Sequence, residues 1–263
     1  MSPDAPAPAR DARLLGDLLA RERRADGPAI RSFAGGAERT VSYRDCATVA
    51  ARAGNFLRHL GVRGVGVGPA PAADGRRDGR RPWLVAVAPD PSPAPIRTFL
   101  GAATIGAVTR FSSNADGKAR ALVVHADEGR RVDPPPGTKL VVYGGQPSRP
   151  GAERWEEGVW SENPATPPTT VEPGDPAVVG DRTHTHADLL SAARATADRL
   201  DLAAGDAVAL RASLADPRVV AAGVLAPLVA GGVVVLPDGE ARARVAVGRG
   251  PEPAVVAPED VPL

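Results

Sequence analysis

The chain has 263 residues, of which 43% are hydrophobic and 24% are charged, a balance that is typical of folded globular domains and excludes a mainly disordered chain. Its formal net charge of +1 excludes the strong positive field that holds a nucleic-acid backbone, so we expect no nucleic-acid partner. The single cysteine, Cys46, excludes an internal disulfide framework and favours a reducing compartment. We interpret it as a small buried residue.

Neither membrane insertion nor secretion is indicated. The longest apolar stretch, residues 219–236, is interrupted by Pro227 and a pair of glycines, whereas a membrane-spanning helix needs about 20 predominantly apolar residues. Residues 1–10 lack the apolar segment of a secretory signal. We therefore expect a cytoplasmic protein that does not bind membranes.

The first part of the chain predicts a helix and a hairpin. Residues 1–10 are rich in alanine and proline and predict a disordered leader. Leucines at helical spacing predict an amphipathic helix over residues 13–21. Residues 29–33 and 39–41 predict the two strands of a hairpin, with a glycine pair at its turn.

A longer helix and a mainly parallel sheet are predicted next. Residues 43–60 follow a 3.6-residue hydrophobic period, with Ser42 as a cap and Gly61 in the place of a C-terminal glycine. The continuous apolar run 83–88 is typical of a strand covered on both faces. The alternation of strands with helices predicts right-handed crossovers and an α/β fold. The further elements predicted in this part are a helix over 96–105 and strands over 107–108, 121–124 and 139–143.

The composition predicts two α/β units joined by a linker. Residues 64–81 and 144–176 are both rich in proline and glycine or other loop-forming residues, and the second stretch is the better boundary. We therefore predict a first unit over 11–143, a Pro-rich linker over 144–176 and a second unit over 177–263. Trp155 and Trp160 in the linker are either a recognition motif or, as we favour, apolar anchors that hold the linker on the body.

The second half of the chain resembles the first. Residues 39–45 are echoed by residues 182–188, and residues 99–108 by residues 224–233. Both halves then predict hairpin, helix, strand, helix and strand in that order. The echo indicates two similar α/β layers with mainly parallel sheets, the alternative being chance similarity in an alanine-rich chain.

The run from Arg39 to Gly68, RTVSYRDCATVAARAGNFLRHLGVRGVGVG, resembles the opening of the adenylate-forming superfamily. This superfamily comprises acyl-CoA synthetases, peptide-synthetase adenylation domains and luciferases. Residues 82–111, 184–206 and 225–237 resemble later stretches of the same family. The resemblance covers about two thirds of the chain and is greatest to acetyl-CoA synthetase-like proteins. It implies the fold of the first part of the enzymes' N-terminal domain.

The departures from the family pattern concern its phosphate chemistry. The family holds ATP with a Ser/Thr/Gly-rich loop that ends in a lysine, because backbone N–H groups and a cation neutralise the phosphates. Here the corresponding interval, residues 176–182, has one glycine, no lysine and the acidic Asp181. The family's adenine and magnesium site and its C-terminal catalytic lysine follow later, and no position of this sequence matches them. The resemblance thus implies ATP or AMP and CoA as ligands, but we expect a catalytically inactive chain with no catalytic residue and no metal site.

A few residues are candidate ligands of a cofactor. Arg182 and Thr183 lie where the family's phosphate loop ends, and Arg211 and Ser213 follow a predicted strand, where ligands of open α/β sheets bind. Ser92, after the strand at 83–88, is a further candidate, although nearby prolines make a poor anion site.

Other motifs have a simpler interpretation. The glycines of 64–68 follow a helix rather than a strand, which disfavours a dinucleotide fingerprint. His184 and His186 could begin a metal site, but an exposed hairpin strand is favoured because no third ligand is evident. Asp188 fits a helix start better than a general base. The basic loop 76–81 could contact CoA phosphates, but a solvated loop is favoured.

Three functions are consistent with the sequence. The first is an acyl-CoA synthetase relative that no longer adenylates. The second is a non-catalytic partner of a complete synthetase or of a second copy, which would cover exposed apolar surface. The third is an acyl- or CoA-binding module.

Overall fold

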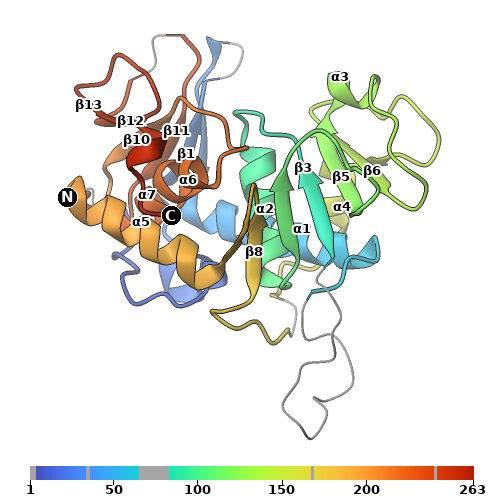
Figure 1. The fold of residues 1–263 in the computed structure, drawn as a ribbon, viewed down its shortest axis with the longest axis horizontal. Helices are drawn as coiled ribbons and strands as arrows, with labels where there is room; N and C mark the ends of the chain where they lie inside the picture. Colours follow the sequence, from blue (N-terminus) through green and yellow to red (C-terminus); the bar gives the residue numbers. More distant parts are fainter. Residues whose placement is uncertain (1–3, 34–35, 65–82, 167–168, 240–241) are drawn as a thin grey trace, which may run out of the picture. The chain divides into compact units, whose positions relative to one another are not determined.

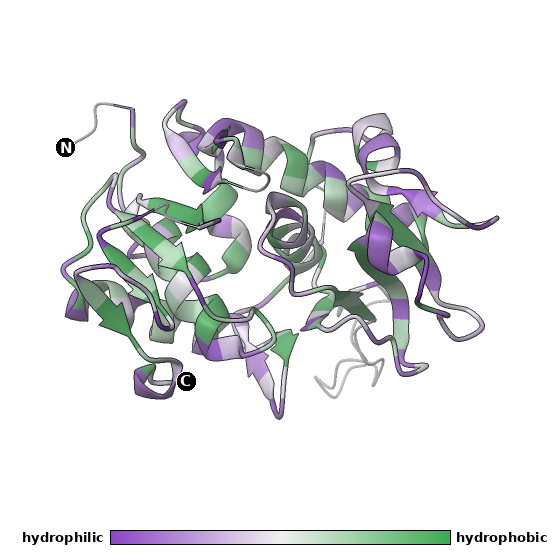
Figure 2. Cartoon of the chain, turned by 90° about the horizontal axis from the view of Figure 1, so that it is seen from above, coloured by the Kyte–Doolittle hydropathy of each residue, from purple (hydrophilic) through white to green (hydrophobic). Residues whose placement is uncertain are grey.

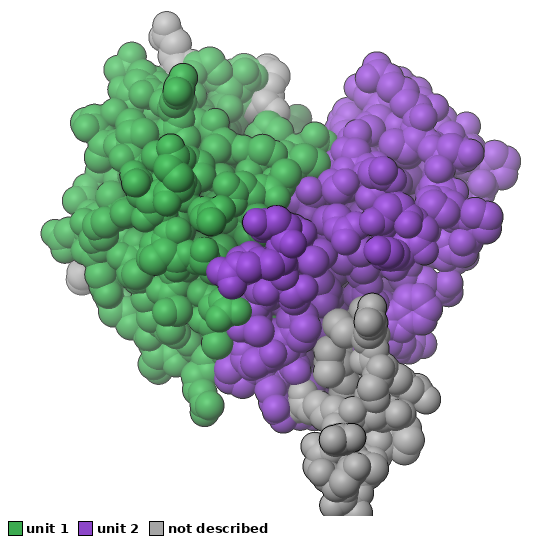
Figure 3. Space-filling view, in the orientation of Figure 1, with its two compact units in different colours: residues 1–48, 89–97, 186–263 green, residues 49–88, 98–185 purple. Residues whose placement is uncertain are grey.

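The computed structural model describes residues 4–33, 36–64, 83–166, 169–239 and 242–263 (Figure 1). The chain forms two compact units, which Figure 3 colours separately. Unit 1 comprises Met1–Thr48, Pro89–Arg97 and His186–Leu263, and unit 2 comprises Val49–Ala88 and Thr98–Thr185. Each unit is built on its own β-sheet.

Unit 1 contains a six-stranded sheet in the order β13-β12-β10-β11-β1-β2. All neighbouring strands are parallel except β1 and β2, which form a hairpin. The strands are β1 (Pro28–Ser32), β2 (Arg39–Ser42), β10 (Ala207–Leu210), β11 (Val233–Leu236), β12 (Val245–Val247) and β13 (Ala254–Val256). The helical segments of unit 1 include α5 (His186–Arg199), α6 (Pro217–Val219), η4 (Val220–Leu225), α7 (Ala226–Ala230) and η5 (Pro258–Asp260).

Unit 2 contains a seven-stranded sheet in the order β7-β6-β5-β3-β4-β8-β9, parallel except for the β8–β9 hairpin. Its strands are β3 (Leu84–Val87), β4 (Val108–Phe111), β5 (Ala119–His125), β6 (Lys139–Tyr143), β7 (Glu153–Arg154), β8 (Pro176–Val179) and β9 (Thr183–Thr185). Helices α3 (Ala126–Gly129) and α4 (Trp155–Ser161) belong to unit 2, and α1 (Tyr43–His59) and α2 (Pro93–Thr104) each begin in unit 1 and end in unit 2.

The predicted echo is confirmed by the topology. Six strands of unit 2, β6-β5-β3-β4-β8-β9, have the same order and the same parallel and antiparallel pairings as β13-β12-β10-β11-β1-β2 in unit 1. In each case the hairpin leads directly into a long helix, α1 after β2 and α5 after β9. The mainly parallel α/β fold is confirmed with it.

The division into contiguous units, however, differs from the structure. Each hairpin pairs with the sheet formed by the other half of the chain: β1 pairs with β11, and β8 pairs with β4. Backbone pairing between distant segments therefore overrides the boundary that composition suggests. Residues 144–176 are part of unit 2 and contribute β7 and α4, so they are not a simple linker.

Short apolar strands and amphipathic helices build the two cores, as the hydropathy colouring of Figure 2 shows along the strands. Every residue of β11 is buried, as expected for a central parallel strand. Helix α1 begins as predicted, because the Ser42 hydroxyl accepts a hydrogen bond from the Asp45 backbone N–H at 3.0 Å. It ends before Gly61, whose φ of +85° is accessible to glycine at little cost.

The N-terminal segment is ordered where a disordered leader was predicted for residues 1–10. From residue 4 onwards it lies on unit 1, where the Ala9 N–H donates to Val229 O at 2.7 Å and the Gly27 N–H donates to Asp4 O at 2.9 Å. These bonds are non-local, so an alanine- and proline-rich composition gives no sign of them.

The helix predicted over 13–21 is replaced by two 3₁₀ turns, η1 (Leu15–Leu19) and η2 (Arg21–Arg23). Leu15 and Leu18 are buried as the pattern predicts. The helix is interrupted at Ala20, whose backbone is extended. The turns are held by Arg23, a buried residue whose guanidinium donates to the backbone oxygens of Ala7, Leu18 and Leu228.

None of the helices in the described part of the chain combines the length and the apolar character needed to span a bilayer.

Candidate functional site

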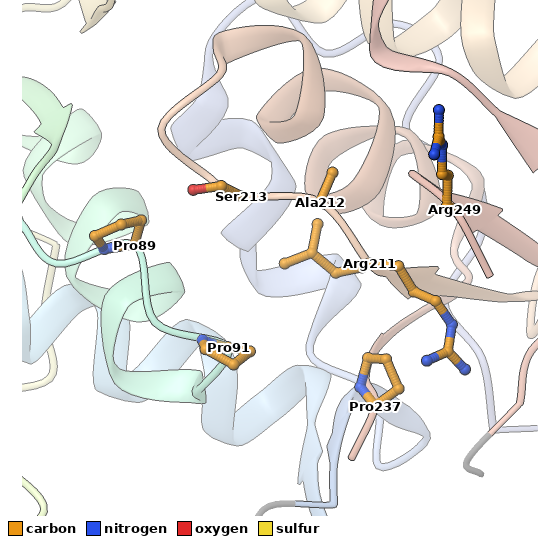
Figure 4. Close-up of a pocket in the computed structure, with 8 residues that line it drawn as sticks. Pro89, Pro91, Arg211, Ala212, Ser213, Pro237 and Arg249 are labelled. Atoms are coloured by element: carbon orange, nitrogen blue, oxygen red, sulfur yellow. The ribbon is translucent and has the colours of Figure 1, made fainter. Parts of the chain in front are cut away.

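A pocket in unit 1 lies at the carboxyl ends of three neighbouring parallel strands. Its volume is about 360 Å³, within the range of small-molecule sites. Its walls come from the residues that follow β10, β11 and β12 and from the loop before α2. Figure 4 shows Arg211 and Arg249 on the side opposite Pro89 and Pro91. The lining residues are Pro89, Pro91, Leu210, Arg211, Ala212, Ser213, Pro237 and Arg249.

Arg211 lines this pocket, but its guanidinium is committed to Glu252. Nε lies 2.9 Å from both carboxylate oxygens, and Nη2 lies 2.7 Å from Oε1. The Glu252 side chain is fully buried and that of Arg211 is 14% exposed. The hydrogen bonds from Arg211 lower the pKa of the Glu252 carboxyl, although burial opposes this shift. The ion pair therefore explains Arg211 as a structural residue.

Backbone contacts fix the strand ends around this ion pair. The Arg211 N–H donates to Val247 O at 2.9 Å, which continues the β10–β12 ladder beyond its last pair. A Cβ at Gly250 would overlap with the Glu252 carboxylate and lie 2.7 Å from Arg211 Nε. Only glycine leaves room for the ion pair at this position.

Ser213 also lines the pocket, in the turn that precedes α6. Its hydroxyl accepts a hydrogen bond from the Ala215 N–H at 3.2 Å. Asp216 then caps α6, with its carboxylate accepting from the Arg218 N–H at 2.9 Å. The local sequence SLADP thus forms a polar turn and helix start, which places the Ser213 side chain at the pocket (Figure 4).

The loop before α2 contributes prolines rather than an anion site. Pro89 and Pro91 line the pocket, whereas Ser92, the predicted candidate, is not among its residues. The first turn of α2 contains Pro93 and Pro95, which lack the N–H groups that bind anions at a helix start.

Arg182 and Thr183 lie in unit 2, so the structure does not bring them together with Arg211 and Ser213 in one unit. They belong to a tight β8–β9 turn in which the Gly180 N–H donates to Arg182 O at 2.9 Å. The Asp181 carboxylate accepts from the Arg182 N–H at 3.0 Å. Arg182 and Thr183 are exposed.

The two histidines are buried, so their prediction as an exposed hairpin strand is wrong. His184 lies in β9 and is 3% exposed, and His186 opens α5 with no exposed surface. The His186 Nδ1 accepts a hydrogen bond from the Leu15 N–H at 3.1 Å, a distant partner that the sequence does not reveal. No group of three or more potential metal ligands occurs in the described residues. Asp188 lies in the first turn of α5, as predicted.

Three further predictions have a clear outcome. Cys46 is buried, and burial raises the pKa of its thiol to about 11, as expected for an unreactive core residue. Trp155 is buried and its Nε1–H donates to Thr98 Oγ1 at 2.9 Å, which confirms the anchor. Trp160 is instead 61% exposed, with the Arg52 guanidinium 4.6 Å from its ring centre, so its predicted burial is wrong.

Most of the glycine motif 64–68 and the basic loop 76–81 lie outside the described residues. The sequence did not single out Arg249, Glu252 or Pro237, which the structure places at the pocket or its ion pair. These three residues follow β11 or β12, strands of only four and three residues. Such short strands give a weak sequence pattern, so the loops after them were hard to identify as strand ends.

The two mainly parallel sheets, each with one antiparallel hairpin at its edge, define an α/β fold that is shared with CoA ligases of known structure. A benzoate CoA ligase from Burkholderia xenovorans has a TM-score of 0.69 at 22% identity, over 89% of this chain and 49% of that chain. The anthranilate CoA ligase AuaEII, in complex with anthranoyl-AMP, has a TM-score of 0.68 at 19% identity over the same shares. The N-terminal domain of FACL13 from Mycobacterium tuberculosis has a TM-score of 0.63 at 19% identity, over 84% of this chain and 56% of that chain.

The chain spans about half the length of these similar structures. No protein-family model and no curated protein matches the sequence. The predicted resemblance is therefore confirmed at the level of the fold, which is that of the N-terminal part of AMP-forming acyl-CoA ligases.

Proposed function

We propose that this chain is a non-adenylating relative of the acyl-CoA ligases whose fold it shares. The observation that supports this is the β8–β9 connection, where Gly180, Asp181 and Arg182 form a closed turn between the paired residues Val179 and Thr183. In the resemblance described above, the ATP phosphate loop occupies this place.

The chemistry of the turn opposes phosphate binding. A phosphate site needs several converging N–H donors and a cation, whereas here two of the turn's N–H groups are used within it, those of Gly180 and Arg182. Asp181 adds a negative charge that would repel a phosphate. One arginine beside this carboxylate gives no net positive charge at the turn.

ATP–pyrophosphate exchange measures adenylation directly. We expect the purified chain to give no exchange above background with acetate, benzoate or anthranilate, while a complete benzoate CoA ligase assayed in parallel exchanges with benzoate. Robust exchange by this chain with any of these acids would refute the proposal.

A second candidate function is small-molecule binding, which the pocket at the end of β10 favours. Its volume and its position at the strand ends fit a ligand site. CoA, acetyl-CoA, AMP and ATP are the first compounds to screen, because a ligand of the folded state raises the thermal midpoint by mass action. The absence of any shift at millimolar concentrations would exclude these four ligands.

We also retain two proposals about context. The first is a cytoplasmic location, in keeping with the single cysteine. The second is a protein partner or a second copy, which the 51% exposure of Val255 on edge strand β13 favours. A monomer by light scattering that recovers no partner in a pull-down at native levels would refute the second.

A further inference from the structure

The segments that lead into β6, β5 and β3 form one edge of the unit 2 sheet. The three strands are neighbours and run parallel (Figure 1), so their amino ends meet at the same edge. The end of α1 joins them, because the Trp83 N–H, just before β3, donates to Arg63 O at 3.0 Å. Residues 58–64, 83–84, 117–121 and 137–139, which make up this edge, include no aspartate or glutamate. Their lysines and arginines, together with one tryptophan, are called here the amino-edge surface: Arg58, Arg63, Trp83, Lys118, Arg120 and Lys139.

The positive charge of this surface is not balanced by carboxylates. None of its lysines and arginines forms an ion pair with a residue that the structure describes. The side chains of Arg63 and Arg120 donate to backbone oxygens instead, Arg63 Nη1 to Arg58 O at 2.8 Å and Arg120 Nη1 to Gly137 O at 3.1 Å. A backbone oxygen carries no net charge, so both arginines keep their full positive charge.

The two lysines of the chain both lie on this surface. Lys118 and Lys139 are exposed, and within the described ranges neither side chain makes a hydrogen bond or an ion pair. Glu162, a carboxylate that approaches the end of α1, is engaged by His59, whose Nδ1 lies 3.2 Å from Oε1. A carboxylate of a ligand would therefore meet ammonium groups that have no competing partner.

Trp83 gives the surface an apolar centre. It is 42% exposed, and the Arg120 guanidinium lies 5.3 Å from its ring centre. Gly61 lets this guanidinium approach, since a Cβ at that position would lie 2.9 Å from Arg120 Nη2. Tryptophan and arginine are the residue types enriched at the energetic centres of protein interfaces.

We infer that the amino-edge surface docks a short, extended acidic segment of a partner protein. One apolar side chain of that segment packs on Trp83, and its carboxylates pair with the surrounding lysines and arginines. Neighbouring strands lie about 4.8 Å apart, so the three strand ends span about 10 Å, the length of about three extended residues. A nucleic acid or an anionic membrane needs positive charge over a wider surface, which a chain of net charge +1 does not supply. The inference is independent of the non-adenylating proposal and of the partner proposed at β13, because β13 belongs to unit 1.

Matched peptides test the charge requirement. Calorimetry on the full chain compares three peptides that share a central phenylalanine, flanked on each side by two residues of glutamate, glutamine or lysine. We expect the glutamate peptide to bind about tenfold or more tightly than the glutamine peptide at low salt, because several exposed ion pairs act together. This preference should shrink at high salt, which screens exposed charges, and the lysine peptide should bind least.

Variants separate this surface from a general effect of charge or of exposed tryptophan. The double variant Lys118→Glu with Lys139→Glu should lose the preference and keep the thermal midpoint of the wild type. Trp83→Ala should weaken the glutamate peptide about tenfold. Trp160→Ala is its matched control, because Trp160 is 61% exposed but lies in α4, whose first turn is acidic, and it should bind the peptide like the wild type.

A measurement on the wild-type chain does not depend on the folding of any variant. Acetylation by an N-hydroxysuccinimide ester, followed by mass spectrometry, reports the accessibility of Lys118 and Lys139. The glutamate peptide should slow the modification of both lysines, and the glutamine peptide should not.

Several results would overturn the inference: equal affinities for the glutamate and glutamine peptides, an undiminished preference in the double lysine variant, equal losses in the two tryptophan variants, unprotected lysines, or no binding of the glutamate peptide at millimolar concentration. Tighter binding to phosphatidylserine vesicles or to a single-stranded oligonucleotide than to this peptide would also overturn it. Pyrophosphate exchange by the wild-type chain bears on the non-adenylating proposal alone.

Discussion

Replacing the buried Arg23 with methionine should loosen the N-terminal segment and destabilise unit 1. Arg23 Nη2 donates to Leu228 O at 2.7 Å, Nε donates to Leu18 O at 3.4 Å, and Nη1 donates to Ala7 O. The three oxygens belong to the N-terminal segment, η1 and α7. One side chain thus joins the N-terminal segment and η1 to α7, whose Leu228 lies 205 residues from Arg23 in the sequence.

The magnitude follows from what Arg23→Met leaves behind. A buried polar group that loses its partner costs about 1–3 kcal/mol, and Arg23→Met removes the donor to three backbone oxygens. The methionine side chain keeps most of the packing of the arginine stem. Desolvation lowers the pKa of Arg23, which shows that burying its charge is unfavourable. The variant removes this unfavourable contribution, which offsets part of the loss. The free energy of unfolding should fall by about 2–4 kcal/mol on this reasoning.

Urea unfolding followed by circular dichroism measures this loss, and hydrogen exchange locates it. We expect faster exchange of the Ala9 and Gly27 amides, which are bonded across the segment. Arg21→Met is the matched control, since Arg21 lies in the same 3₁₀ turn but is exposed. If both variants unfold at the same urea concentration, the account of Arg23 as the anchor is wrong.

Three further outcomes test the ion pair and the tryptophans. Gly250→Ala should lower the free energy of unfolding by about 1–3 kcal/mol, because the added methyl group displaces the ion pair. Arg211 lowers the pKa of Glu252 in the folded state, so the carboxylate stabilises the fold above its unfolded pKa, and this stabilisation is lost as the pH falls through its folded pKa. Glu252→Gln should therefore lower the free energy of unfolding at pH 7 and equal the wild type in strong acid. Unfolding curves of both proteins, measured over a range of pH, check this. Trp155→Phe should cost about 1 kcal/mol or more in thermal unfolding through its lost buried hydrogen bond, whereas Trp160→Phe, at an exposed site, should cost less; equal losses would contradict this account.

The sequence predicts those elements whose causes are local. Helix α1 was predicted with both of its ends, because Ser42 and Gly61 act within one turn of the helix. The strands β3, β5 and β6 were predicted because continuous apolar runs are buried on both faces. The internal echo was also visible in the sequence, because the equivalent elements β2–α1 and β9–α5 need similar patterns of apolar and polar residues.

The errors have distant causes. The order of residues 4–12 depends on Arg23 and on α7, and the burial of His186 depends on a hydrogen bond from Leu15. The pocket was only half predicted: Arg211 and Ser213 do line it, but the partner of Arg211 is 41 residues away. Neither spacing nor composition carries information about such contacts.

Each hairpin pairs with a strand from a distant part of the chain, and this constrains the order in which the protein can fold. Strand β1 pairs with β11, which begins only at Val233, so the hairpin that contains β1 must wait for residues about 200 positions further along the chain. Hairpin β8–β9 likewise completes the sheet of unit 2, whose other strands all precede it in the chain. The helix that follows this hairpin, α5, belongs to unit 1. Pairings over such sequence separations are slow to form, and β1 and β2 expose unpaired edges until they form. We therefore expect neither half to fold as an independent fragment, and the nascent chain to depend on protection until β11 has been made.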